Sequence, residues 1–368
     1  MSKRTGARMV WVWPIVALAF YALAAVVGAR GPIGGSAVGV ALAAALVPVL
    51  LGAVFAAVFH SEVIAHRTGE PAGTLVLTGA VTIIEVALIA SVMAGANAGS
   101  TLARDSVFAV VMIVCNGLIG LCIVIGGVRY REQSFRVTGS GAYLSVLMTL
   151  AVLALVLPNY TESVPGPFYS TVQLVFVILT TLALYAIFLY LQTIRHRDYF
   201  LVEPIEAAAN CDNAGPTDRA VIASAAFLVL SLMGVILLSK KFAASLETGL
   251  ASMGAPEALA GILVALLVLL PEAVAAVEAA RHDKLQKSIN LALGSSLATI
   301  GLTVPAVAVV SIVTNRPVTL GIGAKETVLL VLTFAVSLLT FATGRTNILS
   351  GFVHLVLFAT FALLVFAP

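Results

Sequence analysis

Eleven stretches of apolar residues, each close to twenty residues long, constrain the fold of this chain more than any other feature. Lipid offers the backbone no hydrogen-bond partner, so a segment that crosses it must be a helix or part of a closed barrel. An α-helix needs about 20 residues to cross the hydrocarbon core, and a barrel strand about 10. The sequence therefore predicts an all-α integral membrane protein with about eleven transmembrane helices. These spans are expected at residues 10–29, 35–59, 73–94, 106–128, 140–158, 167–191, 220–239, 258–280, 288–313, 326–343 and 348–367.

The low charge content supports this fold class. The chain is 61% hydrophobic and 10% charged, whereas a soluble domain carries about 25% charged residues. The net charge is +3, but the basic residues are scattered through short connections, so no nucleic-acid partner is predicted. The lipid bilayer is the expected surrounding, and the sequence leaves open whether the chain forms a homo-oligomer.

The longest connection, residues 192–219, is the expected cytoplasmic linker between two halves. The first apolar run follows basic residues but is long enough to span, which favours an uncleaved helix over a signal peptide. The predicted organisation is an extra helix at 1–34, a first half at 35–191 with repeat one at about 66–128, and a second half at 220–368 with repeat two at about 254–313.

The distribution of Lys and Arg predicts the orientation. If the N-terminus is cytoplasmic, 14 of the 20 Lys and Arg residues fall on the cytoplasmic side and 6 on the other. Membrane proteins place their excess of basic residues in cytoplasmic loops. We therefore expect a multi-pass protein of the bacterial inner membrane, with the N-terminus in the cytoplasm and the C-terminus on the opposite side.

Two glutamates lie well inside predicted spans, away from their ends: Glu85 in the third and Glu272 in the eighth. A charge at the centre of a bilayer costs about 2.5–3.5 kcal/mol on insertion scales, so such residues are functional candidates by default. Each follows another glutamate, Glu70 or Glu257, at a distance of fifteen residues. Because the two spans are an odd number of helices apart, they cross in opposite directions. This predicts an inverted repeat, which many secondary transporters use to build a site at the membrane midplane.

Polar residues near each glutamate are candidates to support a cation site. Thr78 and Thr82 precede Glu85 on the same helix face, although threonine in a membrane helix also bonds to backbone carbonyls of its own helix. Pro271 directly precedes Glu272, and a proline within a span removes one backbone hydrogen bond and kinks the helix. The kink either frees carbonyls to act as cation ligands or serves helix packing alone. The adjacent glutamate favours the ligand role.

The ninth span carries a ridge of small and hydroxyl residues. Ser295, Thr299 and Thr303 are spaced by four and share a face. One interpretation is that these residues let helices approach closely. The alternative is that Ser295 or Ser296 supplies an oxygen ligand beside Glu272. In the fourth span, Asn116 with Gly117 holds the corresponding place more loosely.

These groups predict an all-oxygen site that binds a cation between Glu85 and Glu272. Oxygen ligands suit hard cations such as Ca²⁺, Na⁺ and K⁺. A carboxylate binds a cation in its deprotonated form, so metal ions and protons compete for the site. Competition for one site that faces each side of the membrane in turn gives antiport. The predicted function is export of Ca²⁺, Na⁺ or K⁺ in exchange for H⁺, with no resident cofactor.

Other functions are less consistent with the sequence. A nucleophile elbow, a P-loop and an HExxH motif are absent, so the chain is not expected to be an enzyme. The alternatives are a cation-selective channel and a proton-coupled transporter of another solute. His60, Glu62 and His66 are expected to form an interfacial cluster rather than a zinc site. His354 lies within the last span, either as a proton relay or as a packed histidine with satisfied hydrogen bonds.

Several segments resemble the calcium/cation antiporter superfamily, and most closely the ChaA-type sodium/calcium–proton antiporters of bacteria. The similar segments are HRTGEPAGTLVLTGAVTIIEVALI (66–89), RDSVFAVVMIV (104–114), LVALLVLLPEAVAAVEA (263–279), LALGSSLATIGLTVP (291–305) and TGRTNILSGFVHLVLFA (343–359). The resemblance implies two inverted α-repeats, with Glu85 and Glu272 as the paired acidic residues. It places the family's Gly-Ser signature on Gly294 and Ser295.

The chain departs from the broader calcium–proton exchanger pattern in one respect. That pattern has Gly-Asn shortly before the acidic residue, where this chain has Val81-Thr82 and Val268 to Leu270. Without these amides, Na⁺ and K⁺ are candidates beside Ca²⁺. The linker 192–219 holds five acidic residues among three arginines, so a regulatory calcium site is not expected there.

Overall fold

The computed structural model describes residues 3–28, 37–69, 72–95, 101–200, 216–256, 258–315 and 317–367. Within these ranges, eleven helical segments are long and apolar enough to cross a membrane, which confirms the predicted number of spans. Glu70, Glu257 and most of the predicted linker lie outside the described residues. The chain forms two compact units, Met1–Ala96 with Asn213–Gly254, and Asn97–Asp212 with Ala255–Pro368. We call them unit 1 and unit 2 and describe each by itself.

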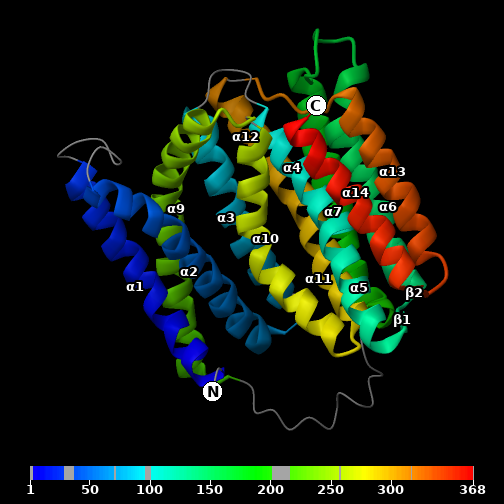
Figure 1. Cartoon of the computed structure of the whole chain (residues 1–368), viewed down its shortest axis with the longest axis horizontal. Helices are drawn as coiled ribbons and strands as arrows, with labels where there is room; N and C mark the ends of the chain where they lie inside the picture. The colour runs from blue at the N-terminus through cyan, green and yellow to red at the C-terminus, as the bar shows by residue number, and fades with distance from the viewer. Residues whose placement is uncertain are drawn as a thin grey trace. The chain divides into compact units, whose positions relative to one another are not determined.

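Unit 1 is a group of four helices in which α2 contacts the other three (Figure 1). Small residues bring these helices close together: a Cβ on Gly52 of α2 would lie 2.2 Å from the Trp13 ring of α1. An ion pair of 2.8 Å joins Arg67, near the end of α2, to Asp218, at the start of α9. The helices of unit 1 are α1 (Lys3–Gly28), α2 (Ala37–Thr68), α3 (Ala72–Gly95) and α9 (Asp218–Met253).

Unit 2 contains the remaining spans, several of which change helix type within the span. Its elements are α4 (Leu102–Met112), the π-helix η1 (Ile113–Leu118), α5 (Ile119–Tyr130), β1 (Glu132–Ser134), α6 (Val137–Ala151), η2 (Val152–Val156), η3 (Leu157–Tyr160), α7 (Thr171–Tyr190), η4 (Leu191–Arg195), η5 (Arg197–Tyr199), α10 (Ala258–Arg281), α11 (Leu285–Ala298), the π-helix η6 (Thr299–Thr303), α12 (Val304–Thr314), α13 (Ala324–Phe341), β2 (Arg345–Asn347) and α14 (Ile348–Phe366).

Two spans of unit 2 run in opposite directions, as an inverted repeat requires. The fourth span passes from α4 at the top of the view to α5 at the bottom, whereas the ninth passes from α11 at the bottom to α12 at the top (Figure 1). Each contains a π-helical turn, η1 or η6. η1 begins 28 residues after Glu85 and η6 begins 27 residues after Glu272. The two repeats therefore share a backbone irregularity as well as a sequence pattern.

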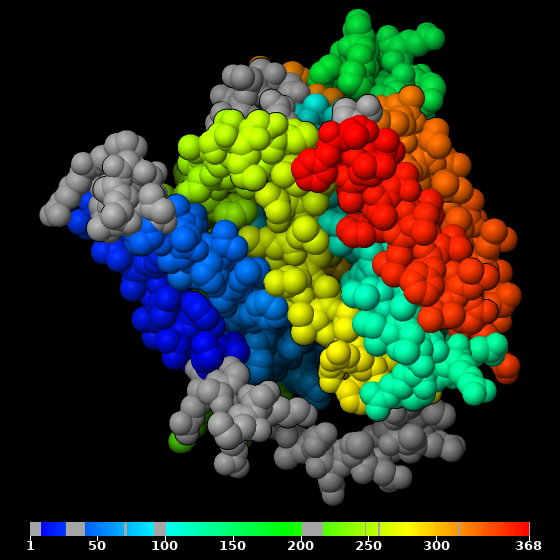
Figure 2. All heavy atoms as spheres, in the orientation of Figure 1, coloured from blue at the N-terminus to red at the C-terminus, as the bar shows by residue number. Residues whose placement is uncertain are grey.

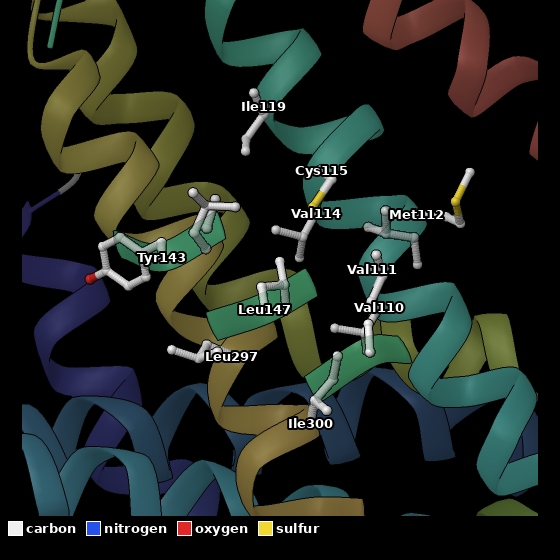
Figure 3. Packing of buried hydrophobic residues seen from close by; sticks show 14 of the residues in the cluster. Val110, Val111, Met112, Val114, Cys115, Ile119, Tyr143, Leu147, Leu297 and Ile300 are labelled. Carbon is white, nitrogen blue, oxygen red and sulfur yellow. The ribbon is translucent and has the colours of Figure 1, made fainter. Parts of the chain in front are cut away.

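The core of unit 2 is formed around the ninth span, which contacts both α6 and the fourth span. Figure 3 shows Tyr143 and Leu147 of α6 beside Leu297 and Ile300, with a row of residues from Val110 to Ile119 nearby. On the surface of the same unit, α13 and α14 lie side by side (Figure 2). This packing fixes the fourth and ninth spans, which carry most of the candidate site residues of unit 2.

Two helix ends and one sheet differ from the sequence-based expectation. α2 continues to Thr68 and α9 to Met253, well beyond the predicted spans 35–59 and 220–239. Hydropathy marks where a segment leaves lipid, but a helix that satisfies its own backbone can continue into water. The antiparallel pair β1–β2, in register from Glu132↔Asn347 to Ser134↔Arg345, was not predicted because both strands are only three residues long.

Candidate functional site

Glu85 lies in α3 and is 3% exposed. The segment is helical because an almost uninterrupted apolar stretch in lipid must satisfy its backbone hydrogen bonds within the segment. α3 packs against α2 and α9 within unit 1. Glu85 is therefore a carboxylate held in the interior, as its position in the third span predicts.

Thr78 and Thr82 follow the face of α3 that leads to Glu85. The Thr78 hydroxyl donates to the carbonyl of Thr74, and the Thr82 hydroxyl donates to the carbonyl of Thr78 at 2.8 Å. Each hydroxyl thus uses its proton within the helix, and its oxygen keeps lone pairs that can face a cation. The backbone contact expected for threonine in a membrane helix is present, and support of a cation stays a prediction.

Glu272 lies in α10, partly buried and directly after the buried Pro271. The helix continues through Pro271, whose ring supplies no N–H for the carbonyl four residues earlier. α10 passes close to α4, since a Cβ on Gly261 would lie 2.8 Å from the backbone nitrogen of Ser106. The α10–α11 connection is fixed by Ser288, whose hydroxyl donates to the Ala276 carbonyl at 2.6 Å.

The ninth span separates its glycines from its hydroxyls. Gly294 and Gly301 face aromatic rings: a Cβ on Gly294 would lie 3.6 Å from the Tyr143 hydroxyl, and one on Gly301 would lie 2.8 Å from the Tyr185 ring. At about 100° per residue, Ser296 and its neighbouring hydroxyls fall on the opposite side of the helix. This hydroxyl face consists of Ser295, Ser296, Thr299 and Thr303.

The hydroxyl of Ser296 is the most informative member of this face. Ser296 is 0% exposed, and its Oγ has no hydrogen-bond partner among the described residues. A buried polar atom left without a partner costs about 1–3 kcal/mol, so an unsatisfied hydroxyl calls for an explanation. Thr299, one turn on and 4% exposed, lies on the same face. The oxygen ligand role of Ser296 stays a prediction, with which its burial and missing partner agree.

Asn116 lies in η1 and contacts α13 and α14 through its amide. Its Nδ2 donates to Thr333 Oγ1 at 2.8 Å, and its Oδ1 lies 3.2 Å from His354 Nδ1. Thr340 Oγ1 lies 3.0 Å from the other ring nitrogen of His354. His354 is thus the packed histidine with satisfied hydrogen bonds that the sequence left as one of two alternatives. Sequence reasoning missed Thr333 and Thr340 as partners, although their spacing of seven on one helix was visible.

The histidine near the end of the second span is buried among helices of unit 1. His60 is 0% exposed, and its ring lies 4.6 Å from Trp11 and 5.5 Å from Phe227 between ring centroids. Its Nδ1 lies 3.3 Å from Ser224 Oγ. α1 and α9 cover this part of α2, and an interfacial cluster of His60, Glu62 and His66 stays a prediction. Over the described ranges, no group of three His, Cys, Asp or Glu is arranged to hold a metal ion.

The candidate residues divide between the two units. Glu85, Thr78 and Thr82 belong to unit 1, whereas Glu272, Pro271, Asn116, Ser295, Ser296 and Thr299 belong to unit 2. Within unit 2, α10 packs on α11, and both contact η1. The pairing of Glu85 with Glu272 stays a prediction.

Over the described residues, eleven helices are long and apolar enough to cross a membrane, and Glu85 and Glu272 lie well inside two of them, which defines a multi-pass membrane protein. The family model described as sodium/calcium exchanger protein matches residues 36–194 and 223–367. The chain belongs to this sodium/calcium exchanger family, which supports a transporter.

Named proteins show which transporters the chain is similar to. The chain is 47% identical to the putative ionic transporter y4hA of Sinorhizobium fredii over 320 residues, which cover 87% of each protein. It is 39% identical to the sodium-potassium/proton antiporter ChaA of Escherichia coli, over 86% of this chain and 87% of that protein. The ChaA-type resemblance is thus confirmed. The solved structure of native YfkE matches with a TM-score of 0.70 at 18% identity, over 98% of this chain and 100% of that one, which shows a shared fold.

Proposed function

We propose that the protein exports Na⁺, K⁺ or Ca²⁺ in exchange for H⁺ by alternating access at a site formed by Glu85 and Glu272. The observation that carries this proposal is the burial of Glu85, 3% exposed in an otherwise apolar stretch of α3. A buried carboxylate in a membrane helix is retained only where its charge has a use, because it opposes insertion by about 2.5–3.5 kcal/mol. Binding either a cation or a proton neutralises that charge.

The other residues have supporting roles in this proposal. Ser296 offers an oxygen that has no protein partner in the described residues, and Ser295 and Thr299 lie on the same face. Thr78 and Thr82 present hydroxyl oxygens on the glutamate's own helix. Pro271 leaves a carbonyl of α10 without its usual donor. Together with Asn116, these groups supply only oxygen, the ligand that Na⁺, K⁺ and Ca²⁺ prefer.

The choice of cation rests on two features. The chain lacks the amide residues that precede the acidic residue in the broader calcium–proton exchanger pattern. Without these amide ligands, the monovalent cations Na⁺ and K⁺ are candidates beside Ca²⁺. The relative ChaA is named for sodium and potassium exchange. We therefore place Na⁺ and K⁺ before Ca²⁺ as cargo. The protein is oriented with its N-terminus in the cytoplasm of a bacterium, as the basic residues indicate.

Everted membrane vesicles with an imposed pH gradient test this function. Adding Na⁺, K⁺ or Ca²⁺ in turn should dissipate the gradient, and the cation with the lowest half-saturating concentration is the preferred cargo. Glu85→Gln and Glu272→Gln each should reduce exchange to the background of vesicles without the protein, since glutamine cannot carry the charge that cation and proton share. Glu278→Gln is the matched control, because Glu278 lies near the end of α10 with its side chain 62% exposed.

The result also separates exchange from a channel. A cation-selective channel would pass the cation down its own gradient without moving protons in return, and its currents would not depend on a pH gradient. Retained exchange in either Gln variant would contradict the paired-glutamate site. A wild-type protein that responds to none of the three cations would contradict the antiport function itself.

A further inference from the structure

A chain of hydrogen-bonded polar side chains crosses the interior of unit 2 and has no role in the function proposed so far. It links Thr340 of α13, His354 of α14, Asn116 of η1 and Thr333 of α13. His354, Asn116 and Thr333 are 0% exposed and Thr340 is 7% exposed. Four polar side chains buried together within membrane-spanning helices are costly unless each is satisfied, so the pattern of their hydrogen bonds is informative.

The hydrogen-bond directions follow from the donors available. Asn116 Nδ2 donates to Thr333, so the atom facing His354 is the carbonyl oxygen Oδ1, which can only accept. With this amide orientation His354 Nδ1 donates, and in the neutral ring Nε2 accepts the proton of the Thr340 hydroxyl. Thr333 in turn directs its own hydroxyl to the Met112 sulfur at 3.5 Å. This assignment of tautomer and amide orientation leaves no unmatched donor in the chain.

Close backbone contacts explain why His354 reaches Asn116. α14 packs against α5 and η1. A Cβ on Gly120 would lie 3.0 Å from both the Gly351 carbonyl oxygen and the His354 Cβ. Glycines at this contact let the two helices approach closely. The His354 imidazole then reaches Asn116 in η1. The Asn116 amide is thus held at its oxygen by His354 and at its nitrogen by Thr333.

The position of Asn116 links this clamp to transport. Asn116 lies in the π-helical turn η1 of the fourth span, in the place that corresponds loosely to Ser295 and Ser296 of the ninth span. Such turns are frequent at functional sites, and η1 contacts both α10, which carries Glu272, and α11, which carries Ser296. The amide has no counterpart in repeat two. With one lone pair of Oδ1 bonded to His354, the second stays available as an oxygen ligand.

We infer that His354 is a positioning residue for cation binding: by donating from Nδ1 to the Asn116 carbonyl oxygen, it fixes the orientation of that amide within the exchange site. The inference rests on the proposed antiport function. His354 acts as a neutral donor and does not carry the exchanged proton. Its loss therefore weakens cation binding without changing how exchange depends on pH.

The test compares two substitutions of His354 in vesicles. His354→Leu removes the donor and should raise the half-saturating cation concentration about tenfold, the value of one lost hydrogen bond to a buried partner, with the maximal rate within about twofold. His354→Asn places an N–H near the position of Nδ1 and should restore binding to within about threefold of wild type. The pH profile of His354→Asn should match that of wild type. Thr360→Val is the control, since Thr360 lies on the same helix and bonds only to its own backbone at Val356.

A double-mutant cycle shows whether His354 acts through Asn116. Asn116→Leu combined with His354→Leu should bind cations no more weakly than Asn116→Leu alone. Thr333→Val loosens the amide from its other end with little change of shape and should also raise the half-saturating concentration, which keeps the test valid if His354→Leu does not reach the membrane. Normal binding in His354→Leu or Thr333→Val, an altered pH profile in His354→Asn, or additive losses in the double variant would overturn the inference. Each of these outcomes leaves wild-type exchange and the loss in Glu272→Gln intact, so failure of the proposed function is distinguishable.

Discussion

The fourth and ninth spans occupy equivalent places in the two repeats and differ in chemistry more than in backbone. Both belong to unit 2, run in opposite directions and contain a π-helical turn at nearly the same distance from a glutamate (Figure 1). The fourth span carries one amide, Asn116, fixed by hydrogen bonds from α13 and α14. The ninth carries the four residues of the hydroxyl face, of which Ser296 has no side-chain partner in the described residues. The repeats have kept a backbone irregularity while their polar groups diverged.

The helices that carry the glutamates differ in a related way. α3 holds Glu85 with two threonines bonded to their own backbone, whereas α10 holds Glu272 after a proline. One helix thus supplies hydroxyl oxygens and the other a freed carbonyl. If both halves contribute to one site, the two inverted repeats supply it with different kinds of oxygen ligand.

The largest expected effect tests whether the two glutamates are equivalent toward protons. At low pH, a cation that displaces one proton from each glutamate should bind with a half-saturating concentration that falls about 100-fold per pH unit, because each released proton contributes a factor of about ten. If one repeat alone exchanges its proton, the fall is about tenfold per unit. Initial rates in vesicles at a series of pH values measure this slope. A slope near zero would mean that neither glutamate releases a proton when the cation binds.

An intermediate effect is expected at the hydroxyl face of repeat two. Ser296→Ala should raise the half-saturating cation concentration about tenfold, since it removes one ligand. It should not lower the melting temperature in detergent, because the lost hydroxyl had no hydrogen bond to a described residue. Ser145→Ala is the matched control, as the exposed Ser145 bonds only to the Ala142 carbonyl. A destabilised variant with normal cation binding would assign Ser296 to packing.

The smallest effect on exchange is expected from packing of the two acid-bearing helices, which changes stability instead. Gly261→Ala should destabilise the protein by about 1–3 kcal/mol, because its Cβ would meet the α4 backbone 2.8 Å away. Gly79→Ala in α3 should be neutral or slightly stabilising, since no described atom lies within 4 Å of its Cβ and alanine favours a helix. Melting temperatures in detergent compare the two. Equal losses would mean that α10 is not constrained more tightly than α3.

Much of the fold could be predicted because lipid leaves the chain few choices. A long apolar stretch in a bilayer must satisfy its backbone internally, so all eleven spans followed from hydropathy. The π-helical turns, the β1–β2 pair and the extensions of α2 and α9 could not be predicted. They depend on neighbours distant in sequence or on water at helix ends, and neither leaves a periodic pattern.

The sequence by itself determined the class of protein, the number of spans and the identity of Glu85 and Glu272 as candidates, because an ionisable residue inside an apolar stretch is conspicuous on energetic grounds alone. Only the tertiary structure decided which polar side chains satisfy one another. Asn116 and His354 are 238 residues apart, and Thr333 lies on a third helix. A hydrogen bond needs its partners within about 3 Å, and helix packing brings such distant residues together without any mark in the local sequence.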